Sequence, residues 1–319
     1  MKSIDIYLLI LAAAYALISI PHNTHVSAFI TQTNKNKPNA PKHKVNLKST
    51  LLNDISQSMS KALNKEVSLK PTSGGGASGG GGASVSAATD ENTNVKYFIK
   101  TASIASGGSR MLRAEYLGVK EIHETGTIKV PKPIVFGEGG ELNTAYVVFE
   151  YLEFVYSGSG YDLGVQLANM HQCTKDQFGF HIDNTIGATP QPNTWCDNWA
   201  DFWDKERLGY MLSKCSNAGY DQKTIDKLRK KTIELLGSHD PVPSLLHGDL
   251  WGGNKGFAKV GDEVIPVIFD PAVYYGDCEV DIAMTHLFGS FGKCSVYQML
   301  IRISFDLRWN LNIMIYIRN

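Results

Sequence analysis

The sequence contains few cysteines, and their spacing excludes the sites that cysteines usually build. Only five occur in 319 residues, and no two of them form a Cys-x-x-Cys pair. The five are Cys173, Cys196, Cys215, Cys278 and Cys294. Neither a zinc site nor a disulfide framework is expected from such a scattered pattern. We expect reduced thiols, most of them packed as small apolar side chains.

Strong charge of either sign is missing as well. The formal net charge is zero, with 43% hydrophobic and 19% charged residues, as in an ordinary soluble globular protein. The charge is unevenly placed, because residues 1–53 hold six lysines and a single acid, Asp5, which leaves the rest of the chain net acidic. Without a basic patch, nucleic acid is not an expected partner. The length fits one large domain or two smaller lobes.

No apolar run near the start is long enough to cross a membrane comfortably. The run from Ile6 to Ile20 is shorter than the roughly 20 residues that a transmembrane helix needs. Val26-Ser27-Ala28 follows, with small residues at the −3 and −1 positions of a cleavage site before Phe29. This layout predicts a secretory signal peptide at residues 1–28. We therefore expect no stable membrane span after processing.

The next segment lacks acidic residues altogether. Residues 29–50 are rich in Lys, Asn, Thr and Ser, which is the composition of a transit peptide. The junction "VSAF" resembles the two-part plastid presequences of algae whose plastids lie inside the secretory system, where Phe directly follows the signal cleavage site. We expect a plastid location. The alternative is the secretory pathway, by plain secretion or a signal anchor.

Residues 51–153 indicate a β-rich lobe. The apolar spacing over residues 51–63 predicts a short amphipathic helix, and alternation over residues 95–100 predicts a strand. Between them lies the segment "GGGASGGGGAS", which contains Gly74, Gly75 and Gly76. Such composition is most often a flexible linker. A glycine-rich hairpin could instead place its backbone N–H groups against phosphates.

A buried acid in the next helix predicts an ion pair. The segment "RMLRAEYLGVKEI" places Met111, Glu115 and Val119 on one stripe of a helix. Because an unpaired buried carboxylate is costly, Glu115 needs a cation, and Lys100 at the end of the preceding strand is the obvious candidate. The alternative is that Glu115 lies at the edge of the stripe and reaches water.

Two further strands and a run of helices complete the outline. "VPKPIVFGE" and "TAYVVFEYLEF" predict strands, and the second could connect the lobes, with its backbone at Glu150 and Leu152 meeting an adenine edge. Residues 154–292 then predict a larger helical lobe, with amphipathic helices from Asp162 and in "NTWCDNWADFWDKERLGYML" and "DQKTIDKLRKKTIELL". The expected fold class is therefore α+β with two lobes.

The stretch "LLHGDLWGGN" carries the chemistry. It offers Asp249 and Asn254 in one tight loop, and Asp270 follows the apolar strand "VIPVIF" shortly afterwards. Phosphoryl transfer needs such a set, because one carboxylate accepts the proton of the acceptor hydroxyl while carboxylate and amide oxygens hold Mg²⁺. Hard oxygen ligands without clustered His or Cys argue against a transition metal.

These segments together resemble the fructosamine kinase (ketosamine-3-kinase) family, a branch of the protein-kinase-like phosphotransferases. The resemblance covers residues 50 to 292. It is carried by "GGGAS", "YFIKT", "MLRAEYLGVKEI", "VPKPI", "FGFHIDNTIGATPQPNTWCDNWADFW", "LLHGDLWGGN" and "FDPAVYYGDCEVDIAMTHLFGSF". It implies a protein-kinase-like bilobal fold that uses ATP and Mg²⁺. The implied substrates are glycated proteins or small ketosamines, phosphorylated on the 3-hydroxyl in protein deglycation repair, with ribulosamines favoured over fructosamines.

The resemblance also implies roles for individual residues. Asp249 would be the catalytic base, and Asn254 and Asp270 would bind Mg²⁺. Lys100 would contact the nucleotide phosphates, with Glu115 positioning it. Gly74, Gly75, Gly76, Glu150 and Leu152 would complete the nucleotide site. Trp251 would stack on the sugar or the amine stem, or pack structurally, and His247 would shape the loop by hydrogen bonding.

Some features depart from the family, and some alternatives stay open. The glycine-rich segment is longer than usual and lacks the Cys often found there. Residues 293–319 show no resemblance, so we expect an atypical tail, a truncated second lobe and a gene-model artefact. The shared loops leave open a kinase of choline or an aminoglycoside, or a non-catalytic binding module. The oligomeric state stays open.

Overall fold

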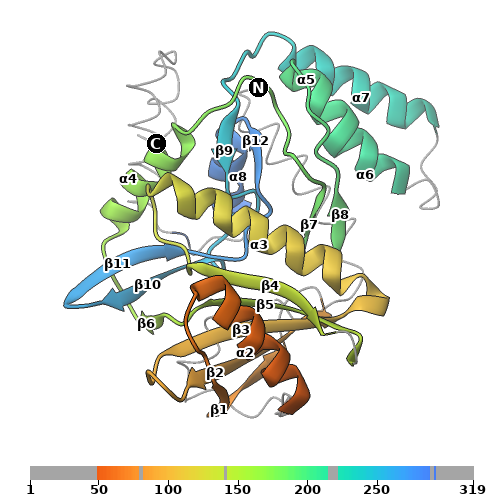
Figure 1. The fold of residues 1–319 in the computed structure, drawn as a ribbon. Coiled ribbons are helices and arrows are strands. Elements are labelled where there is room, and N and C mark those ends of the chain that lie inside the picture. Colours follow the sequence, from red (N-terminus) through yellow and green to blue (C-terminus); the bar gives the residue numbers. More distant parts are fainter. Residues whose placement is uncertain (1–48, 79–81, 140–141, 215–221, 288–290, 292–319) are drawn as a thin grey trace, which may run out of the picture.

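The computed structural model describes residues 49–78, 82–139, 142–214, 222–287 and 291. The signal peptide at residues 1–28, nearly all of the transit-like segment and the tail at 293–319 fall outside these residues. The expected α+β class is confirmed, with a β-rich part and a helix-rich part (Figure 1). Among the described helices, none is long and apolar enough to pass through a bilayer.

The β-rich part is a five-stranded antiparallel sheet in the order β1-β2-β3-β5-β4. Its strands are β1 Leu69–Ser78, β2 Ser84–Asp90, β3 Lys96–Ser103, β4 Pro133–Gly139 and β5 Thr144–Glu150. The two ends of the glycine-rich segment lie in β1 and β2, which pair with each other antiparallel as in a hairpin, so the linker interpretation is wrong. The register between these strands shifts between Pro71 and Gly76, which marks an irregularity beside the glycines.

Two helices cover the sheet, one on each face. Helix α2 (Ser49–Leu63) buries Leu52, Ile55 and Met59 in a cluster that includes Tyr97 and Ile99 of β3. Helix α3 (Gly108–Thr125) packs on the opposite face, where Phe98 of β3 joins the main core; a short 3₁₀ helix, Ile104–Ser106, precedes it. Because both faces are covered, β3 is buried along six successive residues, and Lys100 lies within the covered stretch.

The helix-rich part contains α4 (Gly160–His171), α5 (Trp199–Phe202), α6 (Gly209–Lys214), α7 (Gln222–Leu236) and α8 (Glu279–Leu287). A π-helical stretch, Trp203–Leu208, joins α5 to α6. A three-stranded sheet packs against these helices, in the order β11 (Glu263–Ile268), β10 (Lys255–Val260) and β6 (Glu153–Val155). Two-stranded ladders join β9 (Ser244–Leu246) to β12 (Tyr274–Gly276) and β7 (Asn184–Ile186) to β8 (Thr189–Gln191).

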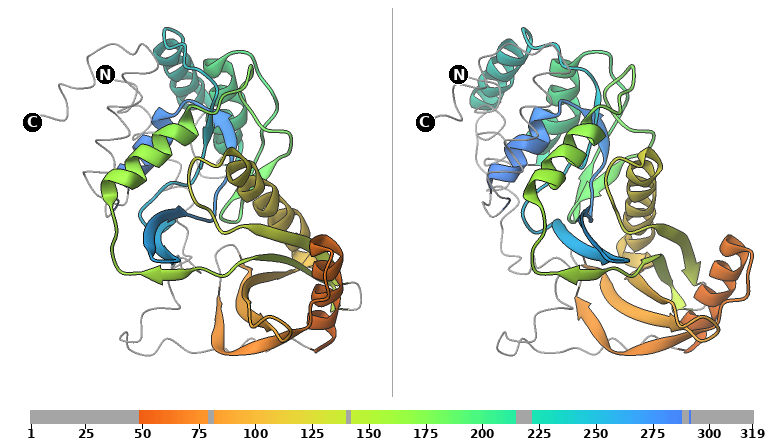
Figure 2. Two further views of the ribbon diagram at one scale, coloured as in Figure 1. Left: turned by 60° about the vertical axis from the view of Figure 1, so that its left-hand side comes forward. Right: turned by 90° about the vertical axis from the view of Figure 1, so that its left-hand side faces the viewer.

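The structure shifts the expected borders slightly. Helix α2 begins at Ser49, two residues before the predicted start of the first lobe at 51. Strand β6 crosses the predicted border between residues 153 and 154, and it pairs with β10 of the second lobe. Helix α3 lies between the five-stranded sheet and the helix-rich part, as both views in Figure 2 show. The main core contains residues of both parts.

Candidate active site

Lys100 lies at the centre of the candidate site. Its Nζ donates to Oε1 of Glu115 on α3 and to Oδ1 of Asp270 beyond β11, each at 2.6 Å. The expected Lys100–Glu115 pair is confirmed, and Glu115 does not reach freely into water, because its side chain is 14% exposed. Burial alone would lower the pKa of Lys100, but Asp270 and Glu115 outweigh it and raise that pKa. Lys100 therefore stays positively charged.

Asp249 and Asn254 share one tight loop after β9. The Asn254 amide nitrogen donates to the backbone oxygen of Asp249 and to its carboxylate Oδ2, each at 2.9 Å. This leaves the Asn254 amide oxygen without a hydrogen-bond partner among the described residues. Asp249 Oδ1 is buried and also has no partner there. Burial, with Asp270 and Asp281 nearby, holds the pKa of Asp249 well above its usual range, although the Asn254 bond opposes the shift.

A buried aspartate, Asp281 on α8, anchors the start of this loop. Its two carboxylate oxygens accept the backbone N–H groups of His247 at 2.8 Å and Gly248 at 2.9 Å. His171 of α4 lies 3.0 Å from the same carboxylate. Burial raises the pKa of Asp281, but His171 beside it and the backbone N–H of His247 outweigh that effect and lower the pKa. The sequence interpretation missed Asp281, although an acid within the apolar run of α8 could have revealed it, as it did Glu115.

His247 shapes the loop by hydrogen bonding, as expected. Its Nδ1 accepts the backbone N–H of Asp249 at 3.2 Å, which requires the neutral ring to carry its proton on Nε2. Nε2 then donates to the backbone oxygen of Phe269 at 3.0 Å. Burial lowers the pKa of His247 and favours this neutral form. One ring thus holds the Asp249 loop against the residue that precedes Asp270.

Asp270 has a strained backbone that its neighbours hold in place. Its φ of +58° lies in the left-handed region, which is uncommon for a residue other than glycine. Before it, the Phe269 N–H donates to the backbone oxygen of Asn254 at 3.1 Å, and after it, the Ala272 N–H donates to the backbone oxygen of His247 at 2.8 Å. These bonds bring Asp249, Asn254 and Asp270 into one site, as the sequence predicted.

The residues expected at the nucleotide lie at the end of β5, in the connection after it, and in β1. Glu150 ends β5, its carboxylate lies 2.5 Å from Lys129 Nζ, and its N–H donates to the Lys132 oxygen at 2.9 Å. Neither contact involves the carbonyl oxygen of Glu150. Leu152 is buried, and its N–H has no hydrogen bond among the described residues. Gly74, Gly75 and Gly76 lie in β1 of the hairpin.

Trp251 packs within its own loop. A Cβ placed on Gly253 would come within 2.1 Å of the Trp251 ring, so the glycine leaves room for the indole to lie over the backbone. The backbone N–H of Trp251 donates to the backbone oxygen of Asp249 at 3.0 Å. The ring is half-buried. This geometry favours the structural role that the sequence left open beside substrate stacking.

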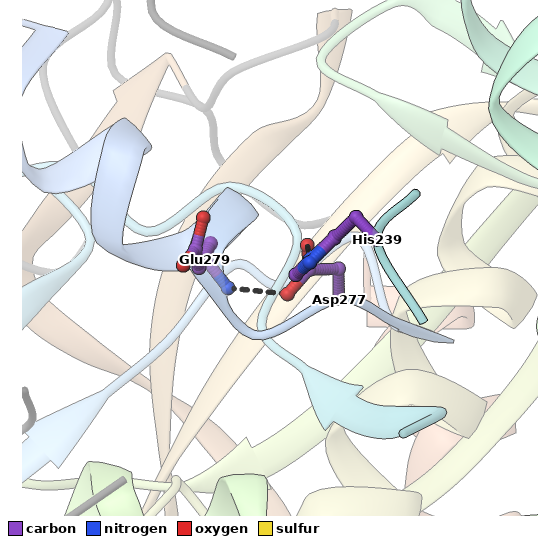
Figure 3. Close-up of side chains that lie close together, drawn as sticks. All are labelled: His239, Asp277 and Glu279. Atoms are coloured by element: carbon purple, nitrogen blue, oxygen red, sulfur yellow. Dashed lines mark hydrogen bonds and ion pairs between the residues drawn. The ribbon is translucent and has the colours of Figure 1, made fainter. Parts of the chain in front are cut away.

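A second group of ionisable side chains lies outside the loop that holds Asp249 and Asn254. In the described part of the chain, ligand atoms of His239, Asp277 and Glu279 lie within 4.8 Å of one another (Figure 3). Asp277 accepts the Glu279 N–H at 3.0 Å, as a capping residue of α8 does, and His239 Nε2 lies 2.7 Å from its other oxygen. Burial lowers the pKa of His239, but Asp277 outweighs it and raises that pKa. His239, which is partly exposed, and the buried Asp277 therefore pair with each other next to the start of α8.

Comparison with solved structures defines the class of protein first. A structure from Haemophilus somnus assigned as a fructosamine-3-kinase superposes with a TM-score of 0.65 at 26% identity, covering 78% of this chain and 81% of that one. Another, from Thermobifida fusca, has a TM-score of 0.59 and covers 80% of this chain and 87% of that chain at 21% identity. The two-lobed, protein-kinase-like fold expected from the sequence is thereby confirmed.

The chain belongs to the fructosamine kinase family, whose model matches residues 51–304. The match runs past Gly292, so the expected end of the resemblance was placed too early. A probable ketoamine kinase of Synechocystis is 45% identical over 199 residues, covering 61% of this chain and 65% of that protein. The chloroplastic protein-ribulosamine 3-kinase of Arabidopsis thaliana is 39% identical over 219 residues, covering 65% and 63%. The chain thus spans a little under two thirds of these two relatives.

Proposed function

We propose that the chain is an ATP-dependent kinase that phosphorylates the 3-hydroxyl of ketosamines. The observation that carries this proposal is the free Asp249 Oδ1, a buried carboxylate oxygen held in a loop with Asn254. Asp249 would accept the proton of the acceptor hydroxyl as its oxygen takes the γ-phosphoryl group of ATP and ADP leaves. The raised pKa of Asp249 makes it a stronger base than an ordinary aspartate.

The donor set fits a Mg²⁺ ion. The Asn254 amide oxygen and the second carboxylate oxygen of Asp270 have no partner among the described residues, and oxygen ligands of this kind suit Mg²⁺. Asn254 and Asp270 would hold the ion, which when bound would neutralise phosphate charge. Lys100 would donate to the nucleotide phosphates, with Glu115 fixing its position. The hairpin of β1 and β2, with Leu152 at the connection, would complete the nucleotide site.

The substrate class follows from family membership together with the names of the relatives. The names describe ketoamine kinases and protein-ribulosamine 3-kinases. We therefore assign ketosamine adducts of lysine, free or in glycated proteins, and we place ribulosamines ahead of fructosamines. Phosphorylation of the 3-hydroxyl would make such an adduct unstable, so the reaction would repair glycated protein.

An acceptor panel tests this function. We expect ADP release with ribulosyl-lysine and, at a lower rate, with fructosyl-lysine, and none with choline or an aminoglycoside. The position of the new phosphate is read by ³¹P NMR, and unmodified lysine is the control. Turnover of choline or the aminoglycoside alone would establish the kinase of another small alcohol. ATP binding without turnover of any acceptor would establish the non-catalytic binding module.

The proposed location is the plastid. Its support is the run Ile6–Ile20, the acid-free segment from Phe29, and the chloroplastic relatives. We expect residues 1–50 to carry a fused fluorescent reporter into the plastid of a diatom. Phe29→Ala should divert the reporter to the secretory lumen, while Thr31→Ala, a neutral change two residues on, should not. Equal secretion of the reporter from all three sequences would show that the leader is an ordinary signal peptide.

A further inference from the structure

The segment that follows Asp270 is short and enclosed. Residues 271–276 are all buried, and β12 within them pairs with β9, the strand that leads into the Asp249 loop. The Ala272 N–H already donates to the His247 oxygen. The backbone oxygens of Ala272 and Val273 lie in this buried segment and need hydrogen-bond partners of their own. A buried carbonyl group without a hydrogen bond is costly.

A second stretch of chain, residues 178–193, supplies those partners. We call it the clamp segment. Gly179 and Tyr275 exchange two backbone hydrogen bonds, at 2.9 and 2.8 Å. Gly179 has a φ of +131°, and a Cβ there would come within 2.7 Å of the Asn193 oxygen. Glycine is therefore required where the clamp segment closes on itself beside Tyr275.

Three buried amide side chains complete the contact. The Asn184 amide nitrogen donates to the Val273 oxygen at 2.7 Å, and the Gln191 amide nitrogen donates to the Ala272 oxygen at 3.0 Å. The Asn184 amide oxygen accepts from Gln191 at 2.9 Å and from Asn193 at 3.0 Å. These side chains are 5%, 6% and 1% exposed in the order Asn184, Gln191, Asn193. Each amide thus aligns the next, and two of them end on the backbone just beyond Asp270.

The same segment beyond Asp270 also touches the helix that carries Glu115. The Tyr275 hydroxyl donates to Glu121 of α3 at 2.7 Å. A Cβ on Gly118 of α3 would lie 3.1 Å from Val273, so helix and segment are in close contact. Residues 271–275 are therefore held by α3 on one side and by the clamp segment on the other.

We propose that Asn184 and Gln191 are positioning residues that hold the Asp270 carboxylate where it binds a divalent cation. The inference rests on the proposed function, because it takes Asp270 as the metal ligand. The left-handed backbone of Asp270 is strained and persists only if its surroundings fix it. The backbone oxygens of Asn254 and His247 accept the N–H groups of Phe269 and Ala272. The side-chain amides of Asn184 and Gln191 donate to the carbonyl groups of residues 273 and 272. Two side chains far from Asp270 in sequence thereby set its geometry.

Two substitutions remove the amide bonds to residues 272 and 273 and keep the side-chain shape. Asn184→Asp retains the oxygen that accepts from Gln191 and Asn193, but it turns a carboxylate oxygen toward the Val273 oxygen. Gln191→Glu turns a carboxylate oxygen toward the Ala272 oxygen, and it also removes the bond that Gln191 donates to the Asn184 amide oxygen. The main readout is the binding of Mn²⁺ in the presence of ADP, measured by electron paramagnetic resonance. We expect about tenfold weaker Mn²⁺ binding in each variant, as for other outer partners of metal ligands. Binding of ADP in EDTA should be unchanged.

The matched control is Asp204→Asn. Asp204 is a buried acid of the same helix-rich part, and among the described residues its carboxylate accepts from Arg229 and from no residue of 270–276. It should lower the melting temperature without weakening Mn²⁺ binding. If it weakens Mn²⁺ binding as much as the two test variants do, or if those variants bind Mn²⁺ like the unaltered protein, the positioning role is overturned. Should Asn184→Asp not fold, Gln191→Glu and Asn193→Asp carry the test, because both leave the donor to Val273 in place.

The outcomes separate this inference from the proposed function. An unaltered protein that binds Mn²⁺ with ADP but phosphorylates no ketosamine contradicts the proposed substrate, while the comparison among variants still decides the positioning role. Unaltered protein that binds no Mn²⁺ with ADP overturns both. Hydrogen exchange of the peptide covering residues 268–277 gives a second readout, and we expect it to quicken in Asn184→Asp and Gln191→Glu but not in Asp204→Asn.

Discussion

Asp249→Asn is expected to remove phosphoryl transfer almost completely. An amide of the same shape cannot accept the proton of the acceptor hydroxyl, and loss of a general base typically lowers the rate by about 10²–10⁴-fold. The loop itself should survive, because the Asn254 amide can still donate to the backbone oxygen of residue 249. In the proposed function Lys100 and the connection between the lobes bind the nucleotide, so nucleotide binding should change little. Single-turnover transfer from labelled ATP and equilibrium binding of ADP measure the two properties.

The control for this prediction is Asp204→Asn, which also converts a buried acid to its amide but lies outside the site. It should keep the catalytic rate of the unaltered protein at a temperature where both are folded. If Asp249→Asn turns over within tenfold of the unaltered protein, Asp249 is not the base. The pH profile gives a further check. Only the ionised carboxylate accepts a proton, so the rate of the unaltered protein should fall as the pH drops through the raised pKa of Asp249. The residual rate of Asp249→Asn should not show this fall.

Gly248→Ala should cost more stability than any other glycine substitution in the loop after β9. Gly248 has a φ of +79°, and a Cβ there would lie 2.1 Å from the Ala272 oxygen, which is backbone and cannot turn aside. The Ala272 segment would have to move, and it carries the geometry of Asp270. We expect a loss of about 4 kcal/mol in the free energy of unfolding, and a catalytic rate at least about 10²-fold lower in protein that still folds.

Gly261→Ala is the matched control for the backbone strain alone. Gly261 lies in the turn between β10 and β11 with a φ of +62°, and a Cβ there would meet nothing within 4 Å. It should lose only about 1–2 kcal/mol, the cost of a left-handed residue with a side chain, and keep its activity. Urea unfolding and steady-state rates of both variants decide the matter. Equal losses in the two variants would mean that the contact between Gly248 and Ala272 is not close.

The sequence predicted those parts of the site that depend on local patterns. Asp249 and Asn254 are five residues apart in one loop, and Glu115 stood out because an acid interrupted an apolar stripe. The β1–β2 hairpin was ambiguous, because glycines pack no side chains and their composition is shared with linkers. The whole tertiary fold was needed before β2 could be placed beside β3.

The contacts that sequence could not predict join distant residues without a periodic signal. Asp270 bonds to Lys100 across 170 positions of the sequence. Asp281, on helix α8, accepts from the backbone N–H groups of residues 247 and 248. The buried amides of Asn184 and Gln191 look like loop residues, since polar side chains in a proline- and glycine-containing stretch are usually exposed. Only their hydrogen bonds to residues 272 and 273 show that they are interior groups.

The shared position of Lys100 makes two binding events dependent on each other. Its ammonium group donates to Glu115 in one lobe and to Asp270 in the other, so it joins the lobes by charge. If Lys100 turned toward a nucleotide phosphate, its bond to Asp270 would weaken, and that carboxylate would then be open to a divalent cation. In the proposed function, phosphate binding by Lys100 and cation binding by Asp270 would therefore be thermodynamically linked, and each should strengthen the other by the same factor.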